Sequence, residues 1–286
     1  VLSEMYDMAQ SGAIAFGDGK YPVQSPGILL KAMQYVMAIG KTIIQVPVDN
    51  SIGGHGLMNE GIVSTQLGLP GKPAIAEELM IARDIELLKY TGSKLHITGV
   101  STKKGMELIN KAKQEGINIS YSVSPCHAYF CDEDLKNYDT NLKLNPPLRT
   151  RADMESIREA IINGNADCIA SHHNPQHWDN KTCEFEYAKN GMLGLQTMFG
   201  VLNGFGAGLD TLIEKLSINP RKIFDLPVPE IKEGSSACLT IFDPAAEYVF
   251  EKEMIVSKSY NSAFVGRKMK GRVLGVINNG KTSFKQ

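Results

Sequence analysis

Apolar positions along the chain follow two alternating patterns, one with helical spacing and one of short runs bounded by glycine, proline or polar residues. The short runs predict strands at residues 13–16, 42–48, 95–100, 117–123 and 167–171, and the helical pattern predicts helices at 28–39, 73–90, 102–115, 151–163 and 194–204. Consecutive strands joined by helices run in the same direction, so the alternation predicts an α/β fold with a parallel sheet. A barrel and an open doubly wound sheet both fit.

The pattern changes near residue 219. Residues 219–224 form a short helical turn, and residues 237–244 form an isolated apolar strand. Residues 271–281 contain two short strands around Asn279-Gly280, a dipeptide typical of tight hairpins. We therefore expect a main domain at residues 1–232 and a small β-domain at residues 233–286.

Composition excludes several classes of protein. The 286 residues are 43% hydrophobic and 21% charged, and the net charge of −1 offers no basic field for nucleic acid. No run approaches the length of about 20 apolar residues that a membrane span needs. Five cysteines without CxxC spacing predict reduced thiols and a cytoplasmic protein. The GxGxxG and GxxxxGKS/T nucleotide signatures are absent, and the first residues look like the middle of a helix, as if the sequence began inside a domain.

The stretch DCIASHHNPQ, residues 167–176, is the main candidate site. A short apolar strand leads directly into His172 and His173, which precede an Asn-Pro turn. Barrel enzymes place ionisable side chains at the carboxyl ends of their strands in this way. A purely structural histidine pair fits the same pattern, so both interpretations stay open at this point.

The sequence NPPLR at residues 145–149, followed by residues 167–175, resembles dihydroorotase of the amidohydrolase superfamily, which carries NPPLR and then D-x-I-A-S/T-D-H-A-P-H. Further matches lie at residues 12–16, 22–24, 58–61, 76–78, 83–85, 100–102, 191–197 and 241–244. The resemblance implies a distorted (β/α)8 barrel of the TIM type with a small β-sandwich. On that template the chain supplies barrel strands four to eight and the C-terminal part of the sandwich.

The resemblance also implies a reaction. Dihydroorotase interconverts L-dihydroorotate and N-carbamoyl-L-aspartate, using one or two Zn²⁺ ions that lower the pKa of a bound water. In the family an aspartate after strand eight moves the proton, and histidines after strands five and six hold the second metal. The HxH motif that supplies two further ligands belongs to strands one to three, which this chain lacks on the template.

The chain departs from this ligand set at most positions. Asp18 matches the family's acidic ligand on strand four. Pro47 stands at the histidine position of strand five, and Gly99 stands at the ligand position of strand six, so neither provides a metal donor. His172 replaces the catalytic aspartate after strand eight. These four positions predict a degraded metal site.

The positions that contact substrate in the family are changed in part. Asn145 matches a substrate-contacting asparagine, although a turn residue before two prolines would look the same. Gln176 stands where the family has a substrate-binding histidine. The remaining histidines of this region, His55, His127, His173 and His177, have no spacing diagnostic of a separate metal site.

Two functions are compatible with these departures. The first is a dihydroorotase-family scaffold that has lost catalysis and serves a structural or regulatory role in pyrimidine synthesis, with zinc absent or weakly bound. The resemblance implies aspartate transcarbamoylase as its partner and a homodimer. The composition indicates neither nucleic acid nor membrane as a partner. The second is an active metal-dependent dihydroorotase or related cyclic amidohydrolase that takes ligands from N-terminal residues absent from this chain. The loss of ligands at Pro47 and Gly99 favours the first.

Overall fold

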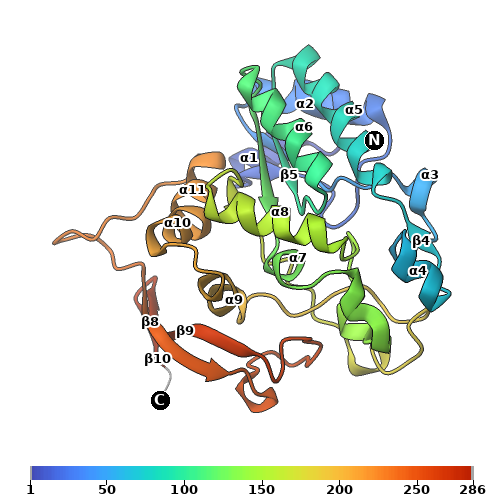
Figure 1. The fold of residues 1–286 in the computed structure, drawn as a ribbon. Coiled ribbons are helices and arrows are strands. Elements are labelled where there is room, and N and C mark those ends of the chain that lie inside the picture. The colour runs from blue at the N-terminus through green and yellow to red at the C-terminus, as the bar shows by residue number, and fades with distance from the viewer. Residues whose placement is uncertain (1, 285–286) are drawn as a thin grey trace.

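A computed structural model describes residues 2–284, and its centre is a parallel sheet of five strands (Figure 1). The strands are β1 (Ala15–Phe16), β2 (Thr42–Gln45), β5 (Leu95–Thr98), β6 (Ile119–Val123) and β7 (Cys168–Ile169). They lie in the order β1-β2-β5-β6-β7, and each neighbouring pair is parallel. Since the order in the sheet is the order in the sequence, the chain winds in one direction, as in a barrel and unlike a doubly wound sheet.

Four long helices cover this sheet: α2 (Pro26–Ala38), α5 (Ile75–Thr91), α6 (Lys103–Gln114) and α8 (Arg151–Ile162). Neighbouring helices pack in sequence order, α2 on α5, α5 on α6 and α6 on α8. Side-chain oxygens of Ser25, Thr102 and Thr150 accept hydrogen bonds from backbone N–H groups in the first turns of α2, α6 and α8. The predicted helices are confirmed.

The core lies between the sheet and these helices. Fully buried side chains from the helices, such as Leu29, Ile81 and Ile109, pack against Ile97 and Tyr121 of the strands. The strands are buried on both faces, which explains why they appear in the sequence as continuous apolar runs rather than as alternating ones.

The structure also contains several short elements, most of them in segments where no element was predicted. A two-stranded parallel sheet forms from β3 (Met58–Asn59) and β4 (Gly71–Lys72). The short helices are α1 (Met5–Gln10), α3 (Asn50–Gly53), α4 (Ile62–Leu67), α7 (Pro125–Tyr129), α10 (Leu209–Ile213) and the π-helix η4 (Glu214–Ile218), with 3-10 turns η1 (Asp132–Asn137), η2 (Thr140–Leu142), η3 (Trp178–Asn180) and η5 (Lys252–Met254). These elements have two to six residues, too few for a hydrophobic period to be recognised.

The C-terminal region forms an antiparallel sheet of β8 (Leu239–Val249), β9 (Lys268–Asn278) and β10 (Lys281–Phe284), in the order β10-β9-β8. The predicted hairpin is confirmed, with both turn residues, Asn279 and Gly280, at positive φ. Strand β8 continues past the predicted end at Pro244. The register breaks between Asp243 and Glu247, so the proline, which has no N–H to donate, falls in an irregular part of the ladder.

Helix α9 (Met198–Gly204) joins this sheet to the rest of the molecule by packing against β9. The amide of Asn203 donates to the carbonyl oxygens of Pro244 and Lys270, at 2.8 and 3.0 Å. The backbone of Gly271, at φ 96°, comes so close to α9 that a Cβ there would lie 2.6 Å from Phe199. Only glycine fits such an approach.

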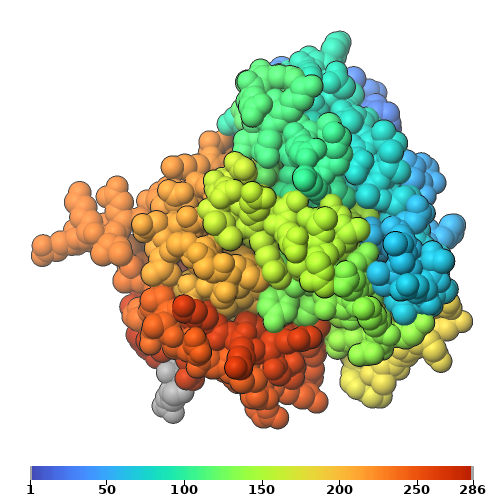
Figure 2. Space-filling view, viewed as in Figure 1, coloured from blue at the N-terminus to red at the C-terminus, as the bar shows by residue number. Residues whose placement is uncertain are grey.

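Helix α11 (Asn219–Ile223) is followed by an exposed segment that leads to β8 and projects from the body of the molecule (Figure 2). The predicted boundary between residues 232 and 233 falls in this segment and stays a prediction. In the part of the chain that the structure describes, no helix has the length and apolar character needed to cross a bilayer.

Candidate functional site

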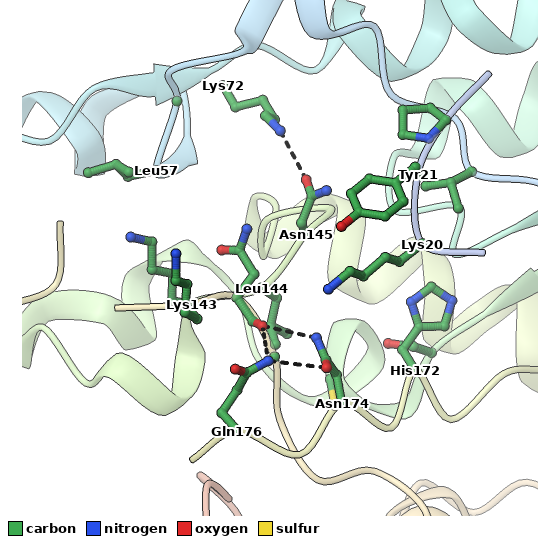
Figure 3. A pocket seen from close by; sticks show the side chains of 18 of the residues that line it. Lys20, Tyr21, Leu57, Lys72, Lys143, Leu144, Asn145, His172, Asn174 and Gln176 are labelled. Atoms are coloured by element: carbon green, nitrogen blue, oxygen red, sulfur yellow. Dashed lines mark hydrogen bonds between the residues drawn. The ribbon is translucent and has the colours of Figure 1, made fainter. Parts of the chain in front are cut away.

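A pocket of about 1120 Å³ opens at the carboxyl ends of the parallel strands (Figure 3). Loops after all five strands line it: residues 19–22 after β1, Val46 after β2, Thr98 at the end of β5, Ser124 after β6, and residues 172–174 after β7. The carboxyl ends of parallel strands are where barrel enzymes assemble their active sites. This pocket is therefore the candidate site.

His172 occupies the centre of the predicted site and contacts the strand-six position. Its backbone has φ 46°, and its Nε2 atom lies 3.2 Å from the hydroxyl of Thr98. A Cβ built on Gly99 would lie 2.2 Å from Cε1 of His172, so the imidazole fills the space that a side chain at residue 99 would need. Burial, helped by the nearby His127, lowers the pKa of His172 to about 4, and the ring is neutral at physiological pH.

The second histidine of the pair has a structural role. Nδ1 of His173 accepts a hydrogen bond from the backbone N–H of Gly194 at 3.2 Å, and His173 forms an isolated parallel bridge with Met192. It therefore ties the loop after β7 to residues 192–194. Of the two interpretations of the pair, the structural one describes His173.

His127 and Ser124 form a hydrogen-bonded pair in the pocket that no sequence pattern marked. Nε2 of His127 lies 3.0 Å from the carbonyl oxygen of Pro146 and so donates to it, which leaves Nδ1 to accept the Ser124 hydroxyl at 2.7 Å. Burial lowers the pKa of His127 to about 4, which makes it a poor base at neutral pH. Ser124 also caps α7, by accepting from the His127 N–H. The Ser-Pro dipeptide before α7 is the signal for this cap.

Asn145 and Gln176, the two predicted substrate-contacting positions, both line the pocket. The Oδ1 atom of Asn145 accepts a hydrogen bond from the ammonium group of Lys72 at 2.9 Å. The amide of Gln176 instead donates within its own loop, to Oδ1 of Asn174 and to the carbonyl oxygen of Asn190. No sequence pattern marked Lys72, because lysine in a glycine-rich stretch usually lies on the surface.

The predicted metal positions do not form a ligand set. Asp18 is exposed and is absent from the pocket lining, and its backbone carbonyl accepts from Tyr21. Pro47 is buried two residues after β2, and Gly99 is buried directly after β5; neither side chain offers a donor atom. Within residues 2–284 no three or more histidine, cysteine, aspartate or glutamate side chains are grouped so that they could hold a metal ion. Among the described residues, the predicted positions therefore do not assemble a set of zinc ligands.

Arg149, the last residue of NPPLR, lies beneath the pocket in a buried network. Its guanidinium donates to Oγ of Ser101, to Oδ1 of Asn59 and to the carbonyl oxygen of Lys72, at 3.0 to 3.1 Å. It also forms an ion pair with the buried carboxylate of Glu77, at 3.4 Å. That carboxylate accepts hydrogen bonds from the backbone N–H and the hydroxyl of Ser101. The network holds the segments after β5 and around β3 and β4 in place below the site.

Comparison with known proteins identifies the family. Residues 2–105 match the family model described as Dihydro-orotase-like. The chain is 38% identical to the dihydroorotase of Geobacter metallireducens, with 100% of this chain and 68% of that protein covered. It is 40% identical to the dihydroorotase of Caldanaerobacter subterraneus subsp. tengcongensis, with 100% and 67% covered. This chain belongs to the dihydroorotase family.

Solved structures confirm the fold class. The L-hydantoinase (dihydropyrimidinase) from Arthrobacter aurescens is similar with a TM-score of 0.86 and 24% identity, over 98% of this chain and 66% of that one. The D-hydantoinase (dihydropyrimidinase) from Thermus sp. gives a TM-score of 0.87 at 17% identity, over 99% and 68%. Both are amidohydrolase barrels of the TIM type, which agrees with the one-directional strand order. Dihydroorotases and hydantoinases are metal-dependent families.

Proposed function

We propose that this chain is a dihydroorotase-family scaffold that has lost catalysis and has a structural or regulatory role in pyrimidine synthesis. The contact between Gly99 and His172 carries the proposal. Gly99 stands at the position of a metal ligand, and His172 stands at the position of the catalytic aspartate. The imidazole of His172 fills the space that a side chain at residue 99 would need. Two losses that fit together sterically indicate a site that has been rebuilt without its metal.

The charge of the pocket supports the same conclusion. The family reaction needs a carboxylate at the position of His172, both to take a proton and to balance the charge of the metal. His172 is neutral at physiological pH because its pKa is lowered to about 4. Neither aspartate nor glutamate is among the described residues that line the pocket. A wall with four lysines and no carboxylate repels a divalent cation and cannot balance its charge.

Metal content and turnover, measured on the same preparation of the whole protein, test the proposal. After purification with zinc present, we expect less than stoichiometric zinc and no conversion of dihydroorotate or N-carbamoyl-L-aspartate above the rate without protein. Stoichiometric zinc, together with turnover that His172→Ala abolishes, would instead establish the alternative, an active metal-dependent cyclic amidohydrolase.

The proposed role includes assembly with aspartate transcarbamoylase and a homodimer, both of which come from the family resemblance. Analytical ultracentrifugation of the protein alone and with aspartate transcarbamoylase of the same organism tests each part separately. A dimer and a larger joint species are expected. A monomer in the first experiment would contradict the proposed homodimer. Unchanged sedimentation of both proteins in the mixture would contradict the proposed assembly with aspartate transcarbamoylase.

A further inference from the structure

Five side chains form a continuous hydrogen-bonded row along the parallel sheet, called the polar row below. The hydroxyl of Ser120 lies 2.8 Å from Nδ1 of His96, and Nε2 of His96 lies 3.2 Å from the hydroxyl of Ser122. Ser122 is bonded to the hydroxyl of Thr98 at 3.0 Å, and Thr98 lies 3.2 Å from Nε2 of His172. The polar row therefore leads without a gap from the interior of the sheet to the pocket, which Thr98 and His172 line.

The strand register explains why these groups are neighbours. His96 is paired with Ser120 and Thr98 with Ser122, so the four side chains lie on the same face of β5 and β6. Ile97, which lies between His96 and Thr98 in the sequence, points to the opposite face and packs in the core under the helices. The face away from the helices is therefore polar here, whereas branched apolar side chains dominate this face in most barrels of the TIM type.

The polar row is uncharged at neutral pH. Ser122 is fully buried, and His96 is 3% exposed. Burial, and then the nearby His172, lower the pKa of His96 to about 4. Burial also lowers the pKa of His172 to about 4. Each imidazole therefore carries one ring proton, on Nδ1 or on Nε2, and its other ring nitrogen can only accept a hydrogen bond.

Each hydroxyl of the polar row has one proton to donate, and this fixes the order of all the protons. When Ser122 donates to Thr98, Thr98 directs its own proton to Nε2 of His172. Ser122 then has no proton left for His96, so it accepts one from Nε2–H, while Nδ1 of His96 accepts from Ser120. Rotation of the hydroxyls gives the reverse order, in which His96 is protonated on Nδ1 and His172 on Nε2. In both orders the two histidines are opposite tautomers.

We propose that the polar row is a tautomer relay, in which the position of the proton on His172 in the pocket dictates the position of the proton on His96 inside the sheet. A mismatch would set two donors or two acceptors against each other and lose a buried hydrogen bond. The change from one order to the other is balanced, because each imidazole releases one proton to water and takes up one on its other nitrogen. The relay goes beyond the proposed loss of catalysis and requires neither a metal ion nor turnover.

The interior end of the relay lies far from the pocket in the sequence. The ring of His96 contacts that of Phe224 edge to face, with centroids 5.5 Å apart. Phe224 directly follows α11, at the start of the exposed segment that leads to β8. A contact in the pocket that favours one tautomer of His172 would therefore change the edge that His96 presents next to this segment. This gives a regulatory role a physical path out of the pocket.

Variants of His172 that can only accept or only donate a hydrogen bond test the relay. The carboxylate of His172→Glu only accepts, so Thr98 donates to it and His96 is expected to carry its proton on Nε2. The ammonium of His172→Lys only donates, so His96 is expected to carry its proton on Nδ1. Nitrogen-15 chemical shifts of the imidazoles, measured by NMR on the whole protein with labelled histidine, identify each tautomer. The same tautomer of His96 in both folded variants would overturn the inference.

The wild-type protein provides a second test that needs no variant. The fraction of His96 protonated on Nε2 should equal the fraction of His172 protonated on Nδ1, and unequal fractions overturn the relay even if both charged variants fail to fold. Thr98→Val keeps the shape of the side chain and removes its hydroxyl, so adding it to both variants should abolish their difference at His96. A difference that persists would also contradict the relay.

His177→Gln is the control, since His177 is exposed and does not line the pocket, and it should leave the tautomer of His96 unchanged. Thermal unfolding shows whether each variant is folded. Zinc-dependent turnover together with opposite tautomers of His96 and His172 would refute only the loss of catalysis. Absence of turnover together with identical tautomers would refute only the relay.

Discussion

The imidazole of His172 lies in the space that a side chain at Gly99 would enter, with Cε1 2.2 Å from an ideal Cβ. The two residues lie at the ends of β7 and β5, strands that are separated in the sheet by β6. Gly99 also has φ 76°, which a residue with a side chain adopts only at a cost. The two positions are therefore coupled, because a ligand cannot return to residue 99 while His172 keeps its present conformation.

Gly99→Ala is expected to destabilise the protein by about 2–4 kcal/mol, from backbone strain and from the clash with His172. Gly116→Ala is the matched control, since Gly116 has φ 79° and no atom within 4 Å of the place where a Cβ would lie, and it should cost about 1 kcal/mol. Adding His172→Ala to Gly99→Ala should recover about 1–2 kcal/mol. Urea unfolding measures each value. Equal costs for Gly99→Ala and Gly116→Ala would show that the imidazole moves aside freely.

Arg149→Met should destabilise the protein by about 3–5 kcal/mol, because it leaves the carboxylate of Glu77 buried without its ion pair. Arg151→Met removes an exposed pair with Glu133, at 2.7 Å, and should cost about 0–1 kcal/mol. Urea unfolding of the two variants compares a buried and an exposed arginine two residues apart. Similar costs would mean that the network under the pocket contributes little to stability.

The sequence was sufficient for the long elements. Helices α6 and α8 are preceded by Thr102 and Thr150, which cap them, and their apolar positions have a clear helical period. The parallel sheet followed from the alternation, and the family resemblance then selected the barrel over the doubly wound sheet. Local pattern fixed these elements because their information lies within about one helix length of sequence.

The candidate site could be predicted only in part. The resemblance placed Asn145, His172 and Gln176, and the structure brings all three to one pocket. The contact of His172 with Gly99 and the burial of Lys72 depend on loops that are distant in sequence, and no local pattern encodes such distances. Pro47 and Gly99 were informative for a different reason, since a missing donor atom is visible in the sequence without any geometry.

Asn203→Leu is expected to destabilise the contact between α9 and the C-terminal sheet, because it leaves the carbonyl oxygens of Pro244 and Lys270 without a donor. The cost should be about 2–3 kcal/mol, and hydrogen exchange should show faster exchange in β9 than in the five-stranded sheet. Asn163→Leu is the control, since Asn163 is exposed and its amide makes one long hydrogen bond, at 3.5 Å. Exchange that rises equally in both sheets would show that they unfold as one unit.

Stability should fall as the pH is lowered from about 6.5 toward 4, because His96 and His127 are buried in neutral form. Burial lowers the pKa of each to about 4, so the unfolded chain takes up protons that the folded chain does not. At about pH 5, protonation of His96 and of His127 should each lower the free energy of unfolding by about 2 kcal/mol. The pKa of His172 is lowered in the same way, but its side chain is less buried, so it should contribute a smaller loss. Asp84 opposes them, since burial raises its pKa to about 6 and its protonation below that pH favours the folded state by about 1 kcal/mol.

Urea unfolding at neutral pH and at about pH 5 should therefore show a net loss of about 3–5 kcal/mol. His96→Gln can keep hydrogen bonds to Ser120 and Ser122, which both contact the imidazole, and should reduce that loss by about 2 kcal/mol. His55→Gln, at an exposed histidine, is the control and should leave the pH dependence unchanged. If His96→Gln retains the full pH dependence, the proton uptake that drives acid unfolding occurs at residues other than His96.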